Sequence, residues 1–544
     1  MKPAATHDHR YAFPALAVLS LGLAWFWMAH ISATDPWYRN TDMNIHNMAD
    51  ALSLNSGFPP GVVDQPAAPT KFLLALDYRI RNALGALPNW TLKRVARSPE
   101  PLREIAQLVK VGRVHSQWLV IASILVGAAF IGRVTRRFDL ACFTVVLLSG
   151  SSGLIFHGLL VRPELLCATF GGLLATHALW SATESRGSAG RSLWLAVAGM
   201  FLGLALISKL PAVLYVALAF GWCCFASLPF REDQSAENRP SGAWAIGICL
   251  TAAIAALLLL RRISPMEDVL NPAATIRLRI AATTVALAPL VLLAAVRGKF
   301  AHFAVGRVMD FALLLAGMLL CFVGWFGLLR AVLPAGAAES YIAKVLTTTV
   351  YPEPLLRLFT VAEESHRWRE MGRFFLETPV LFPVTTGLAI AIAGLRAMPA
   401  RIRLLTVLLL LQGLGMVFLL SKRQFLEQYS VFAQIPLLMI WALGFFALEC
   451  RENDRRGPRP KWPMALAATG ATLLVITLPV ALVPKYSQFQ PDAEVPVRGL
   501  TITFLYDHDA HPPAYLTAMK QRYPTREEFA AELNKFLSDP ANRY

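Results

Sequence analysis

Acidic and imidazole side chains gather in one polar stretch that follows the first apolar segment of the chain. Asp42, His46 and Asp50 are four residues apart there, a spacing that places all three on one stripe of a helix. A carboxylate in such a place can accept a proton from a substrate hydroxyl, which is general base catalysis. Asp35, directly before Pro36, is a rival for the base. Solvation of a surface helix explains the same pattern, so both interpretations stay open.

Cations, a further acid and a tyrosine recur at the boundaries of later apolar segments. They are Arg162, Glu164, Lys209, Lys422, Arg423 and Tyr429. Guanidinium and ammonium groups suit an anionic leaving group or a lipid phosphate. Loop solvation, or snorkelling of a long side chain to the membrane interface, explains any one cation equally well. Their shared side of the membrane favours a common site.

Long apolar segments must position these side chains. The chain has 544 residues, of which 56% are hydrophobic and only 16% charged, a composition that excludes an ordinary soluble globular protein. We predict an all-α polytopic membrane protein with about thirteen transmembrane helices. The predicted spans lie near 13–32, 117–133, 139–157, 164–183, 192–208, 210–228, 242–260, 279–296, 311–330, 377–395, 402–421, 430–449 and 463–484.

Arginine-rich short loops orient these spans. The loops 133–137, 186–191 and 396–403 fall on one side by parity, which the positive-inside rule makes cytoplasmic. The loops 33–116 and 331–376 then lie outside, as does a small C-terminal region, 485–544, which follows the transmembrane domain 1–484. Arg261 and Arg262 fit this count poorly, because they fall outside. A re-entrant segment beside them would change the parity downstream.

The outer regions carry local signals of their own. We predict amphipathic surface helices in the first outer loop, over 42–55 and 72–87. The C-terminal region is predicted to be α/β, with a strand over 500–505. A helix opens there at Thr525, where Glu528 completes a capping box.

Several classes of function are disfavoured. The net charge of +16 follows from the basic loops between spans, and no nucleic-acid-binding motif accompanies it. The seven cysteines lie in or at the ends of apolar segments, so they predict neither a disulfide framework nor a metal site. Asp507, His508, Asp509 and His511 are of metal-ligand type, but the two prolines that follow favour a turn.

The order of these features resembles a known family. A span comes first, then a long outer loop with an acidic helix and a Gly- and Pro-rich stretch. Arg162-Pro163-Glu164 follows the third span, Ser208-Lys209 the fifth, and Lys422 to Tyr429 precede a late span that contains proline. The chain is similar here to the GT-C superfamily of integral-membrane glycosyltransferases. Within it the protein-mannosyltransferase-like and lipid A aminoarabinose-transferase-like branch is most similar. The resemblance covers about the first 230 residues and, more weakly, 400–450.

The resemblance implies a GT-C-like fold and an inverting transfer of a sugar from a polyprenyl-phosphate donor. The acceptor would be a glycan, a lipid or a protein, at the periplasmic face of a bacterial inner membrane. Asp42 matches the family's base, and Asp35 and Glu164 are further candidate catalytic acids. The implied substrate-binding residues are His46, Arg162, Lys209, Lys422, Arg423 and Tyr429.

Two positions depart from the family pattern. Met43 stands where a second acid is frequent, and Gln65-Pro66-Ala67-Ala68-Pro69 replaces a Lys-Pro-Pro stretch. The resemblance implies no certain cofactor, and a divalent metal stays open.

A transporter or flippase of a lipid-linked or envelope substrate is the alternative. Such proteins place ionisable residues near the middle of the bilayer and contain broken helices and paired repeats. The predicted spans are nearly free of acids, which favours the enzyme. A non-catalytic scaffold of an envelope assembly is a third interpretation, and the acidic first loop disfavours it.

Overall fold

The computed structural model is helical throughout the part of the chain that it describes, with no strand there. The described residues are 12–38, 44–61, 67–185, 188–225, 242–263, 280, 282–285, 299–349, 368–372, 381–395, 398–421, 427–453, 505–506, 513–539 and 542.

Seven of the described helices are long and apolar enough to cross a membrane, which is the architecture of a polytopic membrane protein. They are Phe13–Thr34, Pro101–Thr135, Pro163–Glu184, Ala189–Ser208, Gly306–Val332, Ala400–Leu420 and Tyr429–Leu448. Each coincides with a predicted span. A bent pair of helices makes an eighth candidate.

The other predicted spans are supported less well. The bent pair stands at 139–157, and only shorter apolar helices are described within 210–228, 242–260 and 377–395. The predicted spans 279–296 and 463–484 lie mostly or wholly outside the described residues. The count of thirteen therefore stays a prediction.

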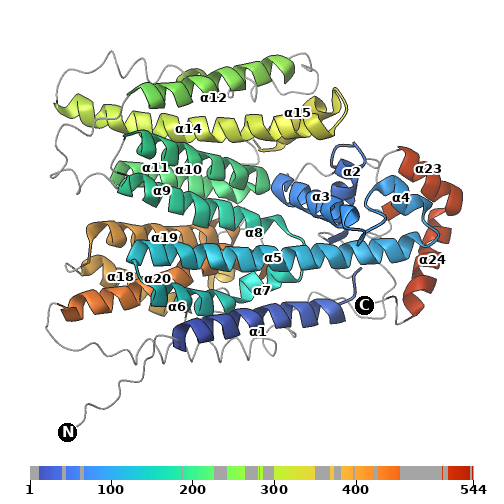
Figure 1. The fold of residues 1–544 in the computed structure, drawn as a ribbon, viewed down its shortest axis with the longest axis horizontal. Coiled ribbons are helices and arrows are strands. Elements are labelled where there is room, and N and C mark those ends of the chain that lie inside the picture. Colours follow the sequence, from blue (N-terminus) through green and yellow to red (C-terminus); the bar gives the residue numbers. More distant parts are fainter. Residues whose placement is uncertain are drawn as a thin grey trace, which may run out of the picture. The chain divides into compact units, whose positions relative to one another are not determined.

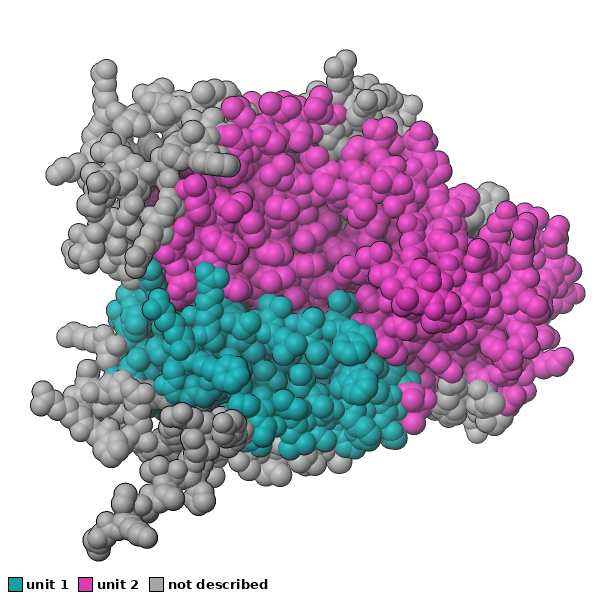
Figure 2. Space-filling view, in the orientation of Figure 1, with its two compact units in different colours: residues 1–32, 116–159, 365–491 teal, residues 33–115, 160–364, 492–544 magenta. Residues whose placement is uncertain are grey.

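The chain divides into two compact units, which Figure 2 colours separately. Unit 1 comprises Met1–Ser32, Ser116–Leu159 and Ser365–Pro491. It contains most of α1 and the second part of α5, and α20 packs there on α6, α7, α18 and α19. The bounds are α1 (Ala12–Thr34), α5 (Pro101–Thr135), α6 (Phe138–Ser149), α7 (Ser152–Gly158), α18 (Leu381–Gly394), α19 (Ala400–Leu420) and α20 (Glu427–Asn453).

A sharp break separates α6 from α7 in unit 1. The two helices meet at 68°, and Ser151 caps α7 by accepting a hydrogen bond from the Leu154 amide at 3.2 Å. The Gln434 side-chain oxygen, from α20, accepts from the Ser151 hydroxyl at 2.7 Å and from the Gly153 amide at 3.0 Å. A Cβ on Gly153 would stand 2.5 Å from the Ser430 hydroxyl. Side chains of Gln434, from α20, and of Ser151 thus satisfy the Gly153 and Leu154 amides at the break.

Unit 2 comprises Ala33–His115, Leu160–Glu364 and Asp492–Tyr544. It holds the first outer loop, a group of long apolar helices and the C-terminal segment (Figure 1). The bounds are α2 (His46–Asn55), α3 (Ala68–Ala83), α4 (Leu92–Arg97), α8 (Pro163–Cys167), the π-helix η3 (Ala168–Leu174), α9 (Ala175–Glu184), α10 (Ser188–Ser208), the 3-10 helix η4 (Leu210–Ala212), α11 (Val213–Phe225), α12 (Gly242–Ile263), α14 (Lys299–Val332), α15 (Ala337–Thr349), α23 (Pro513–Arg522) and α24 (Arg526–Ser538).

Glycine lets α10 and α14 approach closely in unit 2. A Cβ on Gly199 would stand 2.1 Å from the Leu314 carbonyl oxygen, and one on Gly317 2.0 Å from that of Ala196. Gly203 meets Cys321 further along, so residue numbers rise together on both helices and the two are parallel. Small residues allow such contact between membrane helices. Two parallel membrane helices must be separated in the chain by an odd number of membrane spans. The predicted order agrees, because three predicted spans lie between 192–208 and 311–330.

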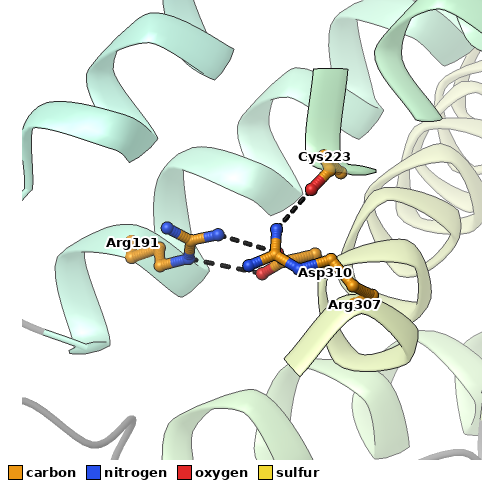
Figure 3. A network of polar contacts seen from close by, with 4 residues as sticks. All are labelled: Arg191, Cys223, Arg307 and Asp310. Carbon is orange, nitrogen blue, oxygen red and sulfur yellow. Dashed lines mark hydrogen bonds and ion pairs between the residues drawn. The ribbon is translucent and has the colours of Figure 1, made fainter. Parts of the chain in front are cut away.

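An ion-pair network joins the same two helices, from Arg191 near the start of α10 to Arg307 and Asp310 in the first half of α14 (Figure 3). The Arg191 guanidinium donates to both carboxylate oxygens of Asp310, at 3.3 and 2.7 Å. Arg307 donates to Asp310 at 3.0 Å and also to the Cys223 carbonyl oxygen, at the end of α11. This network fixes the register of α10, α11 and α14.

The first outer loop corrects one prediction. Residues 47–55 of α2 are all buried, so α2 is not a surface helix. Its polar stripe is covered by partners from other segments, which a sequence pattern does not reveal. α3 does carry an open apolar face, because Leu76, Ile80 and Leu84 are 51%, 49% and 77% exposed.

The C-terminal segment packs on the first outer loop, within unit 2. α23 contacts α4, as Figure 1 shows. The predicted capping box of Thr525 and Glu528 is present at the start of α24. Leu505 lies in a helical turn instead of a strand, and residues 500–504 lie outside the described part. The described part of this segment is therefore helical, whereas the sequence favoured α/β.

Candidate functional site

One carboxylate in α2 is the centre of a buried charged cluster. Asp50 lies 2.8 Å from the Lys71 ammonium, on α3, and 3.5 Å from Nε2 of His46. Its other carboxylate oxygen accepts a hydrogen bond from the Gly61 amide at 2.7 Å. The predicted stripe of His46 and Asp50 is therefore confirmed. Asp42, the predicted base, lies outside the described residues.

The charges around Asp50 keep it ionised. Burial by itself would raise the pKa of Asp50, but the Lys71 ammonium and then His46 outweigh burial and hold that pKa well below its usual range. A carboxylate with so low a pKa is a weak base. Asp50 therefore acts as the counter-ion of Lys71, which is itself buried, and connects α2 with α3.

Two asparagines connect α2 with the start of α8. The Asn44 side-chain oxygen accepts from the Val161 amide, and the Asn47 side-chain amide donates to the Val161 carbonyl oxygen, both at 2.9 Å. These bonds satisfy both backbone groups of Val161. The first outer loop is thereby fixed beside Arg162.

The predicted residues Arg162, Glu164 and Lys209 lie together. Lys209 forms an ion pair with one carboxylate oxygen of Glu164, and Nε of Arg162 lies 3.8 Å from the other. Glu164 is completely buried. Pro163 starts α8, and Lys209 occupies the extended residue between α10 and η4, so each group stands at a helix end. Among the described residues, two cations therefore share one anion.

Asp35, the rival of Asp42 for the role of base, is held by Arg113 of α5. The guanidinium donates to an Asp35 carboxylate oxygen at 2.8 Å, to the Asp35 carbonyl oxygen at 2.7 Å and to the Pro36 carbonyl oxygen at 3.0 Å. Both side chains are buried. This arrangement is an anchor between the end of α1 and α5, and it leaves Asp35 poorly placed to accept a substrate proton.

The placement of the remaining predicted residues relative to these clusters stays a prediction. Lys422 and Arg423 lie outside the described residues, and Tyr429 belongs to unit 1. Among the described residues no three His, Cys, Asp or Glu side chains are grouped as metal ligands would be. The ligand-type residues 507–511 lie outside the described part.

Lys71 and Tyr341 are members of the site that sequence reasoning missed. The Tyr341 hydroxyl is buried and has no hydrogen-bond partner among the described residues. Burial, and after it the negative charge of Asp50, raises the pKa of Tyr341. Tyr341 comes from α15, in the second outer loop, so its nearness to Asp50 has no signal in the sequence. The only signal for Lys71 in the sequence is that a single lysine directly precedes the predicted amphipathic segment 72–87.

Comparison with known proteins adds no relative. No family model, no curated protein and no solved structure matches the chain.

Proposed function

We propose that the chain is an integral-membrane glycosyltransferase of GT-C type. It would move a sugar from a polyprenyl-phosphate donor to an acceptor at the periplasmic face of a bacterial inner membrane. The observation that carries the proposal is the junction of α2 with Arg162, through Asn44, Asn47 and Val161. It brings the loop of the proposed base to a cluster in which two described cations, Arg162 and Lys209, approach the carboxylate of Glu164.

The chemistry assigns a role to each group. Asp42 takes the proton of the acceptor hydroxyl, whose oxygen attacks the anomeric carbon, and the bond to the donor phosphate breaks with inversion. Arg162 and Lys209 stabilise the negative charge that grows on that phosphate. Asp42 is two residues from Asn44 in the chain, which supports its nearness to these cations.

Glu164 and Asp35 receive supporting roles. Because each is buried and paired with a cation, neither is offered as the base. Glu164 orients Lys209, and Asp35 fixes the start of the first outer loop on Arg113.

The test is sugar transfer from a defined polyprenyl-phosphate donor by the purified protein. Removing a general base slows such a step by about a hundredfold or more, so Asp42→Asn should lose transfer to that extent. Asp77→Asn is the matched control, because Asp77 lies in the same loop and pairs with the partly exposed Arg81. Equal transfer by wild type and Asp42→Asn would show that the base is wrong.

A transporter of a lipid-linked substrate is the second candidate, and the broken α6–α7 pair favours it. Discontinuous membrane helices are typical of transport sites. Movement of a labelled polyprenyl-phosphate sugar across proteoliposomes that show no sugar transfer would support this candidate. Transfer without such movement would exclude it.

A further inference from the structure

Arg522, in the last turn of α23, contacts backbone carbonyl groups of the first outer loop with its side chain. Its guanidinium donates to the Ser98 carbonyl oxygen at 2.7 Å and also to that of Pro99. These carbonyls stand between α4 and α5, where Pro99 and Pro101 lack the amide hydrogens that usually serve as donors. An arginine supplies two donors in a fixed geometry that suits such a pair.

A second contact joins the C-terminal segment to the chain near Asp35. The Trp37 indole donates to the Asn542 carbonyl oxygen at 3.0 Å, and Trp37 is completely buried. Asn542 is in turn held to α24, because its side-chain amide donates to the Phe536 carbonyl oxygen at 3.0 Å. Asn542 thus links α24 to the start of the first outer loop by two hydrogen bonds.

The packing around these contacts is continuous. Tyr515, Met519 and Phe529 of the C-terminal segment belong to one buried apolar cluster with Leu92 and Val95 of α4. The Tyr515 hydroxyl donates to the Leu505 carbonyl oxygen at 2.7 Å, and the Tyr506 hydroxyl to that of Tyr523 at 2.5 Å. The segment is therefore internally braced before it meets the loop.

We propose that the described part of the C-terminal segment, residues 505–506, 513–539 and 542, is a positioning element for the first outer loop. Arg522 fixes the α4 side of the loop and Trp37 its start. The proposed base Asp42 lies between Trp37 and Asn44 in the chain, and Asn44 is held to Val161. The consequence for catalysis rests on the proposed function, whereas the positioning itself does not.

The experiment is amide hydrogen exchange of the full-length protein, followed in α4 and α2. We compare wild type with Arg522→Gln, which removes the guanidinium, and Arg522→Lys, which restores part of its donor capacity. Lys535→Gln is the control, because Lys535 is an exposed cation of α24 whose side chain is 79% exposed. Trp37→Phe tests the second contact independently and keeps the buried ring.

Arg522→Gln and Trp37→Phe should each speed exchange in α4 or α2 by about tenfold, as expected for a local opening made easier. Arg522→Lys should return part of the protection, and Lys535→Gln should match wild type. The inference is overturned if Arg522→Gln and Trp37→Phe both exchange like wild type.

Sugar transfer by the same variants separates this inference from the proposed function. Arg522→Gln should lower kcat with little change in the KM of the donor, because a displaced loop misplaces the base. Faster exchange in a protein without transferase activity would uphold the positioning role and reject the proposed function. Unchanged exchange rejects the positioning role whatever the activity.

Discussion

At the scale of single residues, the pair of Asp50 and Lys71 determines how the first outer loop responds to pH. The pKa of Asp50 is lowered in the folded protein. The pair therefore contributes stability that is fully present above the unfolded carboxyl pKa of about 3.9. That contribution is lost as the pH falls through the lower folded pKa.

Asp50→Asn should lower the free energy of unfolding at pH 7 by about 3–5 kcal/mol, because it removes the anion that lies 2.8 Å from the buried Lys71 ammonium. The difference from wild type should narrow below about pH 4, where the Asp50 carboxyl of the unfolded wild-type chain begins to take up protons. Thermal unfolding in detergent at pH 7 and at pH 3.5 measures both effects. Asp77→Asn is again the control, and its partly exposed contacts with Arg81 and His115 should contribute less than about 1 kcal/mol. A constant difference across this pH range would contradict the assignment.

A matched change in the partner tests the same pair. Lys71→Met leaves Asp50 as the buried charge, so it should be about as destabilising as Asp50→Asn. The double variant should be more stable than the sum of the two single losses predicts, since it removes both charges. Strict additivity in the double-mutant cycle would show that the two groups do not interact.

At the scale of elements, the close contact of α10 and α14 is the feature most sensitive to substitution. Gly317→Ala should destabilise by about 1–3 kcal/mol, because the new methyl group would overlap the Ala196 carbonyl oxygen. Gly327→Ala is the control in the same helix, since a Cβ there meets nothing within 4 Å. It should change stability by less than about 0.5 kcal/mol. Equal melting temperatures for the two variants would contradict the packing.

The ion-pair network of Arg191, Arg307 and Asp310 should show an asymmetry. Asp310→Asn leaves Arg191 and Arg307 without their shared anion, whereas Arg191→Met leaves Asp310 still paired with Arg307. The first change should therefore destabilise by about 3–5 kcal/mol and the second by less. Unfolding of purified protein in detergent ranks the two, and the reverse order would show that Arg307 is not an effective partner.

At the scale of the whole molecule, the contact of the C-terminal segment with the first outer loop fixes sidedness. Both must lie on the same side of the membrane, and α5 links that side to the arginine-rich loop after it. The 35 residues of α5 extend for about 50 Å, more than the hydrocarbon core of about 30 Å. The first turns of α5 thus extend beyond the membrane and belong to the first outer loop.

Single cysteines at exposed positions can report this arrangement. Arg103→Cys and Lys535→Cys, whose native side chains are 64% and 79% exposed, should react alike with a membrane-impermeant thiol reagent in intact spheroplasts. Arg136→Cys, past the other end of α5, should react only after permeabilisation. The unsubstituted chain gives the background of its own cysteines. Opposite labelling of positions 103 and 535 would contradict the docking of the C-terminal segment.

The sequence alone determined the membrane class, seven of the spans and the helix that Thr525 caps. These features depend on runs of apolar residues, or on groups three residues apart, so a local pattern suffices. The sequence also selected Arg162, Glu164 and Lys209, because charged groups at the ends of apolar helices are rare enough to be noticed.

Only the tertiary structure decided what those charges do. α2 is buried because Lys71 and Val161, from other segments, satisfy its polar stripe, and Asp35 is an anchor because Arg113 reaches it from α5. The C-terminal segment belongs to the first outer loop because Arg522 and Asn542 find partners more than 400 residues away in the chain. Burial reverses the meaning of a polar pattern when distant groups pair with it, and no local periodicity contains that information.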